Sequence, residues 1–228
     1  MLKTVLVPIH QDGLPFIALA GVASAILFWI WTPLGWFGLV VTAWCVYFFR
    51  DPNRVTPVRD GLVVSAADGT VAALAKVPPP PELDMDPEPV HRVSVFLNVF
   101  DVHMNRAPVD GTVARRVYSP GKFLNAALDK ASDENERLAL RLDRDGAASV
   151  AVVLMAGLLA RRIRCFASEG AHLQRGQRFG LIRFGSRADV YLPPEVEPLV
   201  CVGQRVVGGE TVLADEGARE SARLGEVR

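Results

Sequence analysis

The sequence has no net charge, few cysteines and no metal-ligand spacing, and each absence excludes a class of protein. The 25 basic residues balance the 25 acidic ones, so the chain lacks the basic footprint of nucleic-acid-binding proteins, and we expect no nucleic-acid partner. The three cysteines are odd in number and far apart, which predicts free thiols in a reducing compartment rather than disulfides or a zinc site. The four histidines are also scattered, so we expect no bound metal.

Charge is missing altogether from one long stretch. Residues 16–49 contain no Asp, Glu, Lys or Arg and hold all four tryptophans. A membrane-spanning helix needs about 20 apolar residues, with about 17 as the lower limit. The sequence TPLG at residues 32–35 divides the run into residues 16–31 and 34–49, each close to that limit. We therefore predict a short N-terminal tail over residues 1–15 and a hydrophobic helical hairpin over residues 16–49.

Two placements of this hairpin are open: it spans the bilayer as two short helices, or it lies in one leaflet. A hairpin buried in a soluble core is the alternative, and a cleaved signal peptide is disfavoured because the apolar run continues through its small-residue segment. Lys3 precedes the run, and Arg50, Arg54 and Arg59 follow it. The positive-inside rule then predicts that both ends, and the rest of the chain, lie on the cytoplasmic side of the cell membrane.

The remainder, residues 50–228, shows no alternation of strands and helices and no glycine-rich phosphate loop, which favours a mainly β domain of the barrel or sandwich kind. The sequence DGTVA occurs at residues 68–72 and again at 110–114. Asp-Gly between apolar runs is typical of β-hairpins, so we predict a hairpin turn at each copy. The repeat indicates two similar β units packed together.

Other segments are predicted from the same kind of pattern. Residues 93–108 are expected to form a strand pair that carries one histidine, and residues 137–155 a hairpin that turns at Asp145-Gly146. The proline-rich and acidic residues 78–88 predict a stiff, exposed loop. Residues 122–136 are interpreted as a polar excursion.

Gly185-Ser186 is out of place, because it lies between the apolar, β-prone runs 181–184 and 190–192. The simple interpretation is a β-bulge. The alternative is self-cleavage, in which the Ser186 hydroxyl attacks the Gly185 carbonyl and the resulting ester eliminates to dehydroalanine, which hydrolyses to a pyruvoyl group and ammonia. Glycine suits the attacked position because it has no side chain and tolerates a distorted backbone.

The whole stretch of residues 180–193, GLIRFGSRADVYLP, resembles the processing site of the phosphatidylserine decarboxylase proenzymes, in the short form of bacteria and archaea. The resemblance extends from about Phe48 to Asp215. Larger forms carry Leu-Gly-Ser-Thr or Gly-Gly-Ser-Thr at this site, so Arg187 departs from them and fits the short branch.

The resemblance implies a self-processing carboxy-lyase that converts phosphatidylserine into phosphatidylethanolamine and carbon dioxide. Cleavage between Gly185 and Ser186 would give a β chain, residues 1–185, and an α chain, residues 186–228, which stay together as a heterodimer; a higher oligomer is left open. The cofactor would be the pyruvoyl group made from Ser186, without metal or pyridoxal phosphate. Its ketone would form a Schiff base with the substrate amine and accept the electrons that carbon dioxide leaves behind. Archaetidylserine, which has the same head group on ether-linked chains, is an equally consistent substrate.

The resemblance also implies roles for single residues. Residues 101–108, DVHMNRAP, match the family's histidine motif, which makes His103 the candidate base for the Ser186 hydroxyl. Larger members have a second histidine where this chain has Arg106, so it is open whether His103 serves both maturation and decarboxylation. Asp68 falls at the family's Asp-Gly position and is the candidate that orients the histidine, with Asp110 as the competing copy.

Arg106, Arg183 and Arg187 are candidates for binding the phosphate or carboxylate of a lipid head group, as arginine forks do. The alternative for each is an arginine on a solvated surface.

A non-enzymatic carrier domain is a hypothesis from a different class. Residues 128–131, LDKA, resemble a lipoyl or biotinyl attachment turn. Lys130, however, lies in the polar excursion rather than between paired strands, and this hypothesis leaves Gly185-Ser186 unexplained.

Overall fold

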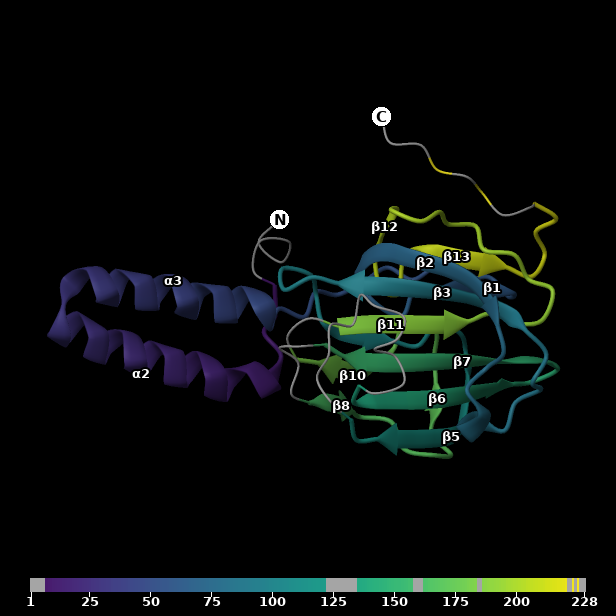
Figure 1. Cartoon of the computed structure of the whole chain (residues 1–228), viewed down its shortest axis with the longest axis horizontal. Helices are drawn as coiled ribbons and strands as arrows, with labels where there is room; N and C mark the ends of the chain where they lie inside the picture. The colour runs from purple at the N-terminus through teal and green to yellow at the C-terminus, as the bar shows by residue number, and fades with distance from the viewer. Residues whose placement is uncertain are drawn as a thin grey trace. The chain divides into compact units, whose positions relative to one another are not determined.

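The structure is a computed structural model, and it describes residues 7–121, 135–157, 162–183, 186–220, 223 and 225. The chain divides into two compact units, Met1–Asn53 and Arg54–Arg228. The first unit is helical and the second is built of β-strands. The predicted class, mainly β with an N-terminal hydrophobic helical hairpin, is confirmed (Figure 1).

The helical unit consists of a 3-10 turn, η1 (Gln11–Gly13), followed by α2 (Leu14–Ile30) and α3 (Thr32–Phe48). A proline lies in the first turn of each long helix, where its missing N–H would have no partner anyway. Trp31 alone separates the helices, with an extended backbone at φ −162° and ψ 121°. The break is thus earlier and shorter than predicted, because TPLG begins α3 instead of forming a loop.

Small residues and hydroxyls form the contact between α2 and α3. A Cβ at Gly35 would lie 2.2 Å from Phe28 Cγ, and one at Gly38 would lie 2.7 Å from Ser24 Oγ. Ser24 Oγ also lies 3.0 Å from Thr42 Oγ1. Such close approach of small residues is common between helices in membranes.

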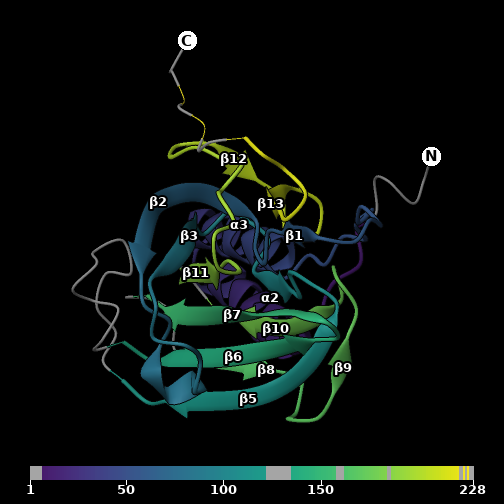
Figure 2. The same ribbon diagram turned by 90° about the vertical axis from the view of Figure 1, so that its right-hand side faces the viewer.

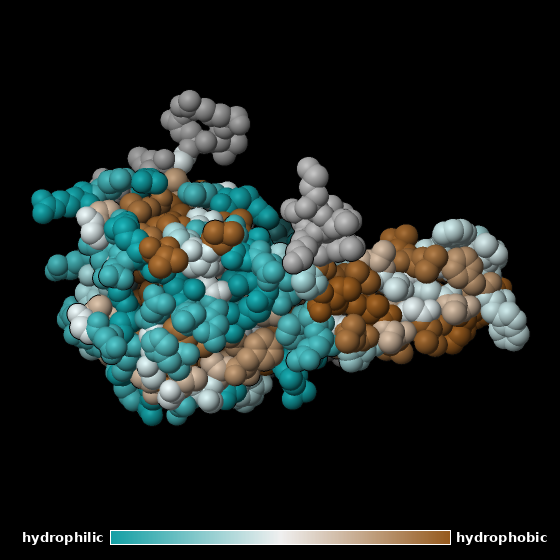
Figure 3. Space-filling model, turned by 180° about the vertical axis from the view of Figure 1, so that it is seen from behind, coloured by the Kyte–Doolittle hydropathy of each residue, from teal (hydrophilic) through white to brown (hydrophobic). Residues whose placement is uncertain are grey.

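Apolar side chains also cover the outside of this unit. Trp29 is 91% exposed, and the unit's surface is largely brown and white in Figure 3, whereas that of the β unit is mainly teal. Within the described residues, Gln11–Ile30 is long and apolar enough to cross a membrane and is 11% buried, and Thr32–Phe48 is a shorter apolar helix. The core helix of a soluble protein would be mostly buried. The exposed apolar side chains of this unit therefore need apolar surroundings that the unit itself does not provide.

An eight-stranded antiparallel sheet dominates the β unit (Figures 1 and 2). Its order is β12 (Arg205–Val206), β2 (Gly69–Val77), β3 (Val90–Leu97), β11 (Ser186–Tyr191), β7 (Ala147–Ala156), β6 (Arg137–Arg144), β5 (Gly111–Ser119) and β9 (His172–Leu173). A three-stranded sheet has the order β4 (Met104–Arg106), β10 (Arg178–Ile182) and β8 (Ile163–Cys165). The strands β1 (Leu62–Val64) and β13 (Val212–Asp215) form a further pair.

Both faces of the central strands are covered. Alternate residues of β3, β7 and β11, such as Val95, Leu154 and Ala188, belong to the main core cluster, as the period of two in a strand requires. Their other face packs in a second cluster around Leu83, which lies in the 3-10 turn η2 (Pro81–Leu83) and is fully buried. The prediction of an exposed loop over residues 78–88 is therefore wrong at Leu83, because this side chain anchors the loop on the sheet.

The predicted hairpin over residues 137–155 is confirmed: β6 and β7 pair and turn at Asp145-Gly146, where Gly146 has φ +66°. The hairpin turns predicted at Asp68-Gly69 and Asp110-Gly111 are wrong. Each dipeptide instead leads into a long strand, β2 or β5, whose partner follows later in the chain as β3 or β6.

The strand pair predicted over residues 93–108 is also wrong, because β3 and β4 belong to different sheets. The polar excursion lies outside the described residues from 122 to 134, and Lys130 with it.

Candidate active site

The site lies where three chain segments cross from the eight-stranded sheet to the three-stranded sheet. In the larger sheet β11 lies between β3 and β7, and in the smaller one β10 lies between β4 and β8. Each strand of the smaller sheet is connected along the chain to the strand at the matching position in the larger sheet, so the three connections start from neighbouring strands. The described residues of these connections are 98–103 in the first, 157 and 162 in the second, and 183 in the third. One carries His103 and another leads into Ser186.

Ser186 is the first residue of β11 and pairs with Leu97 on one side and Ala156 on the other. Its side chain is fully buried, and Ser186 Oγ has no hydrogen-bond partner among the described residues. By the alternation along the strand it shares a face with Ala188 and Val190, both members of the main core. A buried hydroxyl without a partner costs about 1–3 kcal/mol. Gly185, the other half of the predicted cleavage site, lies outside the described residues.

His103 is fully buried and precedes β4. Its Nδ1 lies 3.0 Å from the carbonyl oxygen of Asp101. A carbonyl oxygen only accepts, so the tautomer with its proton on Nδ1 satisfies this contact, and in that tautomer Nε2 is the nitrogen that can accept a proton, as a general base must. The backbone oxygen of His103 accepts a hydrogen bond from Ile182 N at 3.2 Å, which ties the histidine to the segment that leads into Ser186.

Asp101, in the same motif as His103, fixes the segment that carries the histidine. Its carboxylate accepts hydrogen bonds from Arg205 Nη2 at 2.6 Å and from Asn98 N at 2.9 Å. With its carbonyl on His103, Asp101 holds the crossing segment from three directions.

The Asp68 carboxylate accepts hydrogen bonds from a charged side chain and from a backbone N–H. Arg54 Nη2 donates to its Oδ2 at 2.5 Å, and Gly208 N donates to its Oδ1 at 2.8 Å. The residues just before Asp68 lie against the strand that follows His103, because Arg106 N donates to Ala66 O at 2.9 Å.

Arg187 and Ser186 are adjacent in a strand, so they point to opposite faces. Arg187 is buried and makes a bidentate pair with Asp189, at 2.7 and 2.9 Å, and a bond to Ser94 Oγ at 3.0 Å. The Arg187–Asp189 pair therefore belongs to the packing of the face of β11 opposite Ser186. On that same face, burial first and then the charge of Asp189 raise the pKa of Tyr191 above its usual range.

The other two candidate arginines have separate surroundings. Arg106 is buried and donates through Nη1 to Gly176 O at 2.8 Å. Arg183 is partly exposed on the crossing segment, and its backbone N–H donates to Arg162 O at 3.3 Å.

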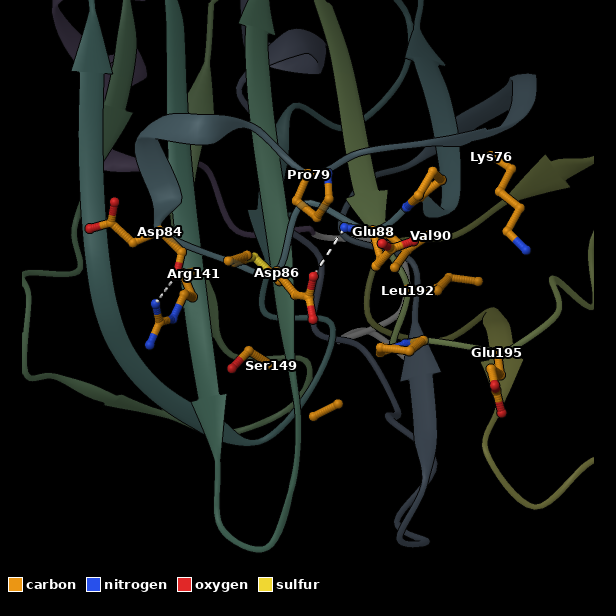
Figure 4. Close-up of a pocket in the computed structure, with 14 residues that line it drawn as sticks. Lys76, Pro79, Asp84, Asp86, Glu88, Val90, Arg141, Ser149, Leu192 and Glu195 are labelled. Atoms are coloured by element: carbon orange, nitrogen blue, oxygen red, sulfur yellow. Dashed lines mark hydrogen bonds between the residues drawn. The ribbon is translucent and has the colours of Figure 1, made fainter.

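A cavity of about 570 Å³ lies elsewhere in the β unit (Figure 4). Its lining includes Val90 at the start of β3 and Leu192 just after β11, whereas Ser186 is at the opposite end of β11. At about 3.3 Å per residue, Leu192 and Ser186 are roughly 20 Å apart. Figure 4 shows Arg141 donating to the backbone of Asp84 at the rim, at 2.7 Å. This cavity is therefore separate from the serine.

Among the residues that the structure describes, no group of three His, Cys, Asp or Glu side chains is placed to hold a metal ion.

Comparison with known proteins gives a consistent family assignment. The family model for phosphatidylserine decarboxylase matches residues 41–214. A phosphatidylserine decarboxylase proenzyme of Paramagnetospirillum magneticum is 56% identical over 221 residues, which cover 97% of this chain and 92% of that protein. Proteins of the same name are 56% identical over 228 residues in Cereibacter sphaeroides, covering 100% of this chain and 98% of that one, and 57% identical over 208 residues in Beijerinckia indica, covering 91% and 89%.

Proposed function

The chain belongs to the phosphatidylserine decarboxylase family, and on that premise we propose that it is a self-processing carboxy-lyase that converts phosphatidylserine into phosphatidylethanolamine and carbon dioxide. We propose further that it matures by cleaving its own backbone between Gly185 and Ser186. The observation that carries the proposal is the Ser186 hydroxyl, which is buried at the start of β11 and has no partner among the described residues.

The first step is attack of Ser186 Oγ on the carbonyl carbon of Gly185. The C–O bond forms, the π pair moves to the carbonyl oxygen, and the hydroxyl proton goes to His103 Nε2, the nitrogen that the Asp101 contact leaves basic. The C–N bond then breaks and the nitrogen takes up a proton, which leaves an ester. Loss of the Ser186 α-proton and cleavage of the ester C–O bond give a Gly185 carboxylate and dehydroalanine, and water converts the dehydroalanine into a pyruvoyl group and ammonia.

The protonated His103 that forms during the attack is stabilised by a nearby negative charge. Asp68 is our candidate, since the residues before it lie against the strand that follows His103. Arg54 and Gly208 fix its carboxylate in place. Asp101 acts on the same histidine through its carbonyl and keeps the crossing segment in register.

Cleavage before Ser186 would leave the two chains associated. β11 is hydrogen-bonded to β3 along one edge and to β7 along the other, so the α chain, residues 186–228, would hold a central strand of a sheet otherwise formed mainly by the β chain, residues 1–185. A heterodimer of the two fragments follows from this position.

The buried, unpaired position of Ser186 suits a pyruvoyl group, whose carbonyls need no charged partner. The chemistry that this group supplies is an electron sink, because its ketone condenses with the substrate amine and accepts the electron pair released with carbon dioxide. Arg183 is our candidate for the lipid phosphate, because it is partly exposed on the segment that leads into the serine. Arg106 and Arg187 instead bind a carbonyl and a carboxylate of their own chain.

The substrate resides in a bilayer, which gives the apolar pair α2 and α3 a purpose as a membrane anchor. Arg50, Arg54 and Arg59 follow the anchor, and we propose on this basis that the β unit works at the cytoplasmic face of the cell membrane.

The test is product formation on vesicles. Wild-type protein and Ser186→Ala are mixed with vesicles that contain phosphatidylserine, and phosphatidylethanolamine is quantified by mass spectrometry, with free serine as a parallel substrate. We expect phosphatidylethanolamine from the wild type alone and no ethanolamine from serine. Equal product from both proteins, or none from a wild type that has cleaved itself, would contradict the proposal. Vesicles of the diether lipid archaetidylserine test whether the acyl linkage matters.

A further inference from the structure

Asn105 is a buried residue whose side-chain amide has no partner in the part of the chain that the structure describes. It is the middle residue of β4, it is fully buried, and neither its Oδ1 nor its Nδ2 makes a hydrogen bond to any described residue. A buried polar group left unpaired costs about 1–3 kcal/mol. Such groups are rare in folded proteins, and each one calls for an explanation.

The side chain of Asn105 lies in the interior between the two sheets. Asn105 pairs with Gly180 of β10. A Cβ at Gly180 would lie 4.0 Å from Asn105 Cβ and 3.4 Å from Leu154 Cδ1. Leu154 is a core residue of β7, so Asn105 and Gly180 face the eight-stranded sheet.

Ser186 faces the same interior. Leu154 is in register with Ala188 of β11, and Ser186 lies two residues before Ala188 on the same face of that strand. The serine hydroxyl and the Asn105 amide are thus two buried polar groups to which no described residue is hydrogen-bonded, on the facing sides of two packed sheets. His103 precedes Asn105 by two residues on an extended stretch, so the proposed base and the amide lie on one side of it.

We propose that Asn105 is a catalytic residue of self-cleavage, in which Nδ2–H donates to the oxygen of the Gly185 carbonyl as Ser186 attacks. This inference rests on the proposed function. The attack places a negative charge on that oxygen, and a prearranged neutral donor among buried groups such as Ser186 and Asn105 is far more effective than a donor in water. Asn105 has an N–H to give, because no described residue accepts it. The amide transfers no proton and forms no covalent bond; it only stabilises the oxyanion.

The unpaired amide predicts opposite effects on cleavage and on stability. Asn105→Leu keeps a side chain of similar shape and removes both polar atoms. Replacing the unpaired amide in this way removes its desolvation cost, so stability should stay level or rise. Loss of one oxyanion donor typically slows a reaction by about 10²–10³-fold. A purely structural asparagine would show the reverse pattern.

The experiment follows cleavage from the moment of synthesis. Wild type, Asn105→Leu, Asn105→Asp and the control Met104→Leu are made by cell-free translation on vesicles, and the fragment 186–228 is quantified over time by intact mass. Met104 is the buried neighbour of Asn105 on β4, and its exchange for leucine conserves volume. Melting temperatures are measured in a Ser186→Ala background, where no variant can cleave. Asn105→Asp keeps the shape and removes the donor, so the inference stays testable if Asn105→Leu does not fold.

We expect both Asn105 variants to cleave about 10²–10³-fold more slowly than the wild type, with Met104→Leu close to the wild-type rate and no fall in melting temperature for Asn105→Leu. Cleavage of either folded Asn105 variant at the wild-type rate, or slowing that merely follows a loss of stability and is shared by Met104→Leu, would overturn the inference and leave the proposed function standing. A wild-type chain that remains intact would overturn both.

Discussion

The two copies of DGTVA, residues 68–72 and 110–114, share a backbone and differ in their surroundings. Each copy opens a nine-residue strand, β2 or β5. Each strand shifts its register at the alanine of the motif, between Val71 and Ala73 in β2 and between Val113 and Arg115 in β5. A two-residue strand pairs with each start, β12 in the first copy and β9 in the second. The repeated sequence therefore specifies a repeated local structure.

The aspartates of the two copies accept similar backbone hydrogen bonds but differ in their exposure and in their arginine partners. Asp68 Oδ1 accepts from Gly208 N at 2.8 Å, and Asp110 Oδ1 accepts from Arg175 N at 3.0 Å. The Asp68 side chain, however, is 14% exposed with Arg54 at 2.5 Å, whereas that of Asp110 is 56% exposed with Arg175 Nη2 at 3.5 Å. Both aspartates thus accept the same kind of backbone hydrogen bond, but the carboxylate is mostly buried in the first copy and mostly exposed in the second.

The partner strands explain the difference. β2 pairs with β3, which leads into the crossing segment of His103 and pairs with β11, the strand of Ser186. β5 pairs with β6, which turns at Gly146 straight into β7. The motif thus sets the backbone, and its neighbours decide which copy lies beside the strand that leads to His103 and the strand of Ser186.

Replacing each aspartate by asparagine should have the largest effect and tests most strongly whether the two copies differ. Asp68→Asn should slow self-cleavage by about 10²-fold or more, because His103 loses the charge that stabilises its protonated form. Asp110→Asn, the matched control, should leave the rate within about twofold, since general acid–base catalysis needs the group near the reacting proton. Time-resolved intact-mass analysis measures both. Equal rates for the two variants would show that the copies do not differ in function.

The glycines of the two copies test the closeness of the strands. A Cβ at Gly69 would lie 2.2 Å from Phe96 O, and Gly69 has φ +157°. A Cβ at Gly111 would lie 2.8 Å from Asp143 O. We expect Gly69→Ala to lower the free energy of unfolding by roughly 3 kcal/mol and Gly111→Ala by about 1–2 kcal/mol. Urea denaturation in the Ser186→Ala background gives both values, and the reverse order would contradict the geometry.

The smallest effect that we predict is a pH-dependent change in stability at Asp143. It concerns only the second copy, because Asp143 pairs with Thr112 there, whereas Phe96 pairs with the matching Thr70 in the first copy. Hydrogen bonds from Arg141, and then from Ser149, lower the pKa of Asp143 below its ordinary value. Its contribution to stability is present above the unfolded pKa of about 3.9 and is lost as the pH falls through the lower folded value. The side chain is 41% exposed, so the contribution stays below about 1 kcal/mol.

The urea midpoints of Ser186→Ala and of the double variant Ser186→Ala, Asp143→Asn should therefore converge as the pH falls below about 4. A constant difference across that range would contradict the assigned pKa.

The helical hairpin could be predicted from the sequence because it rests on residues next to one another. The chemistry of Gly185-Ser186 rests on adjacent residues as well, and it stays a prediction. The Asp-Gly turns were mispredicted for a physical reason: the dipeptide signals a change of direction, but long-range pairing chooses the strand that follows. Arg187 could have been assigned to the face opposite Ser186 from the strand period alone. The contacts of Asp101 and the missing contacts of Asn105 among the described residues depend on distant parts of the chain, and no local pattern carries that information.

We propose that Ser186 cuts the chain, and the sharpest test is intact-mass analysis of the purified protein beside Ser186→Ala. We expect two fragments from the wild type, residues 1–185 and 186–228, the second lighter by one ammonia than a peptide that begins with serine. The variant should remain a single chain. An intact wild-type chain, or the same two fragments from Ser186→Ala, would rule out self-cleavage by Ser186.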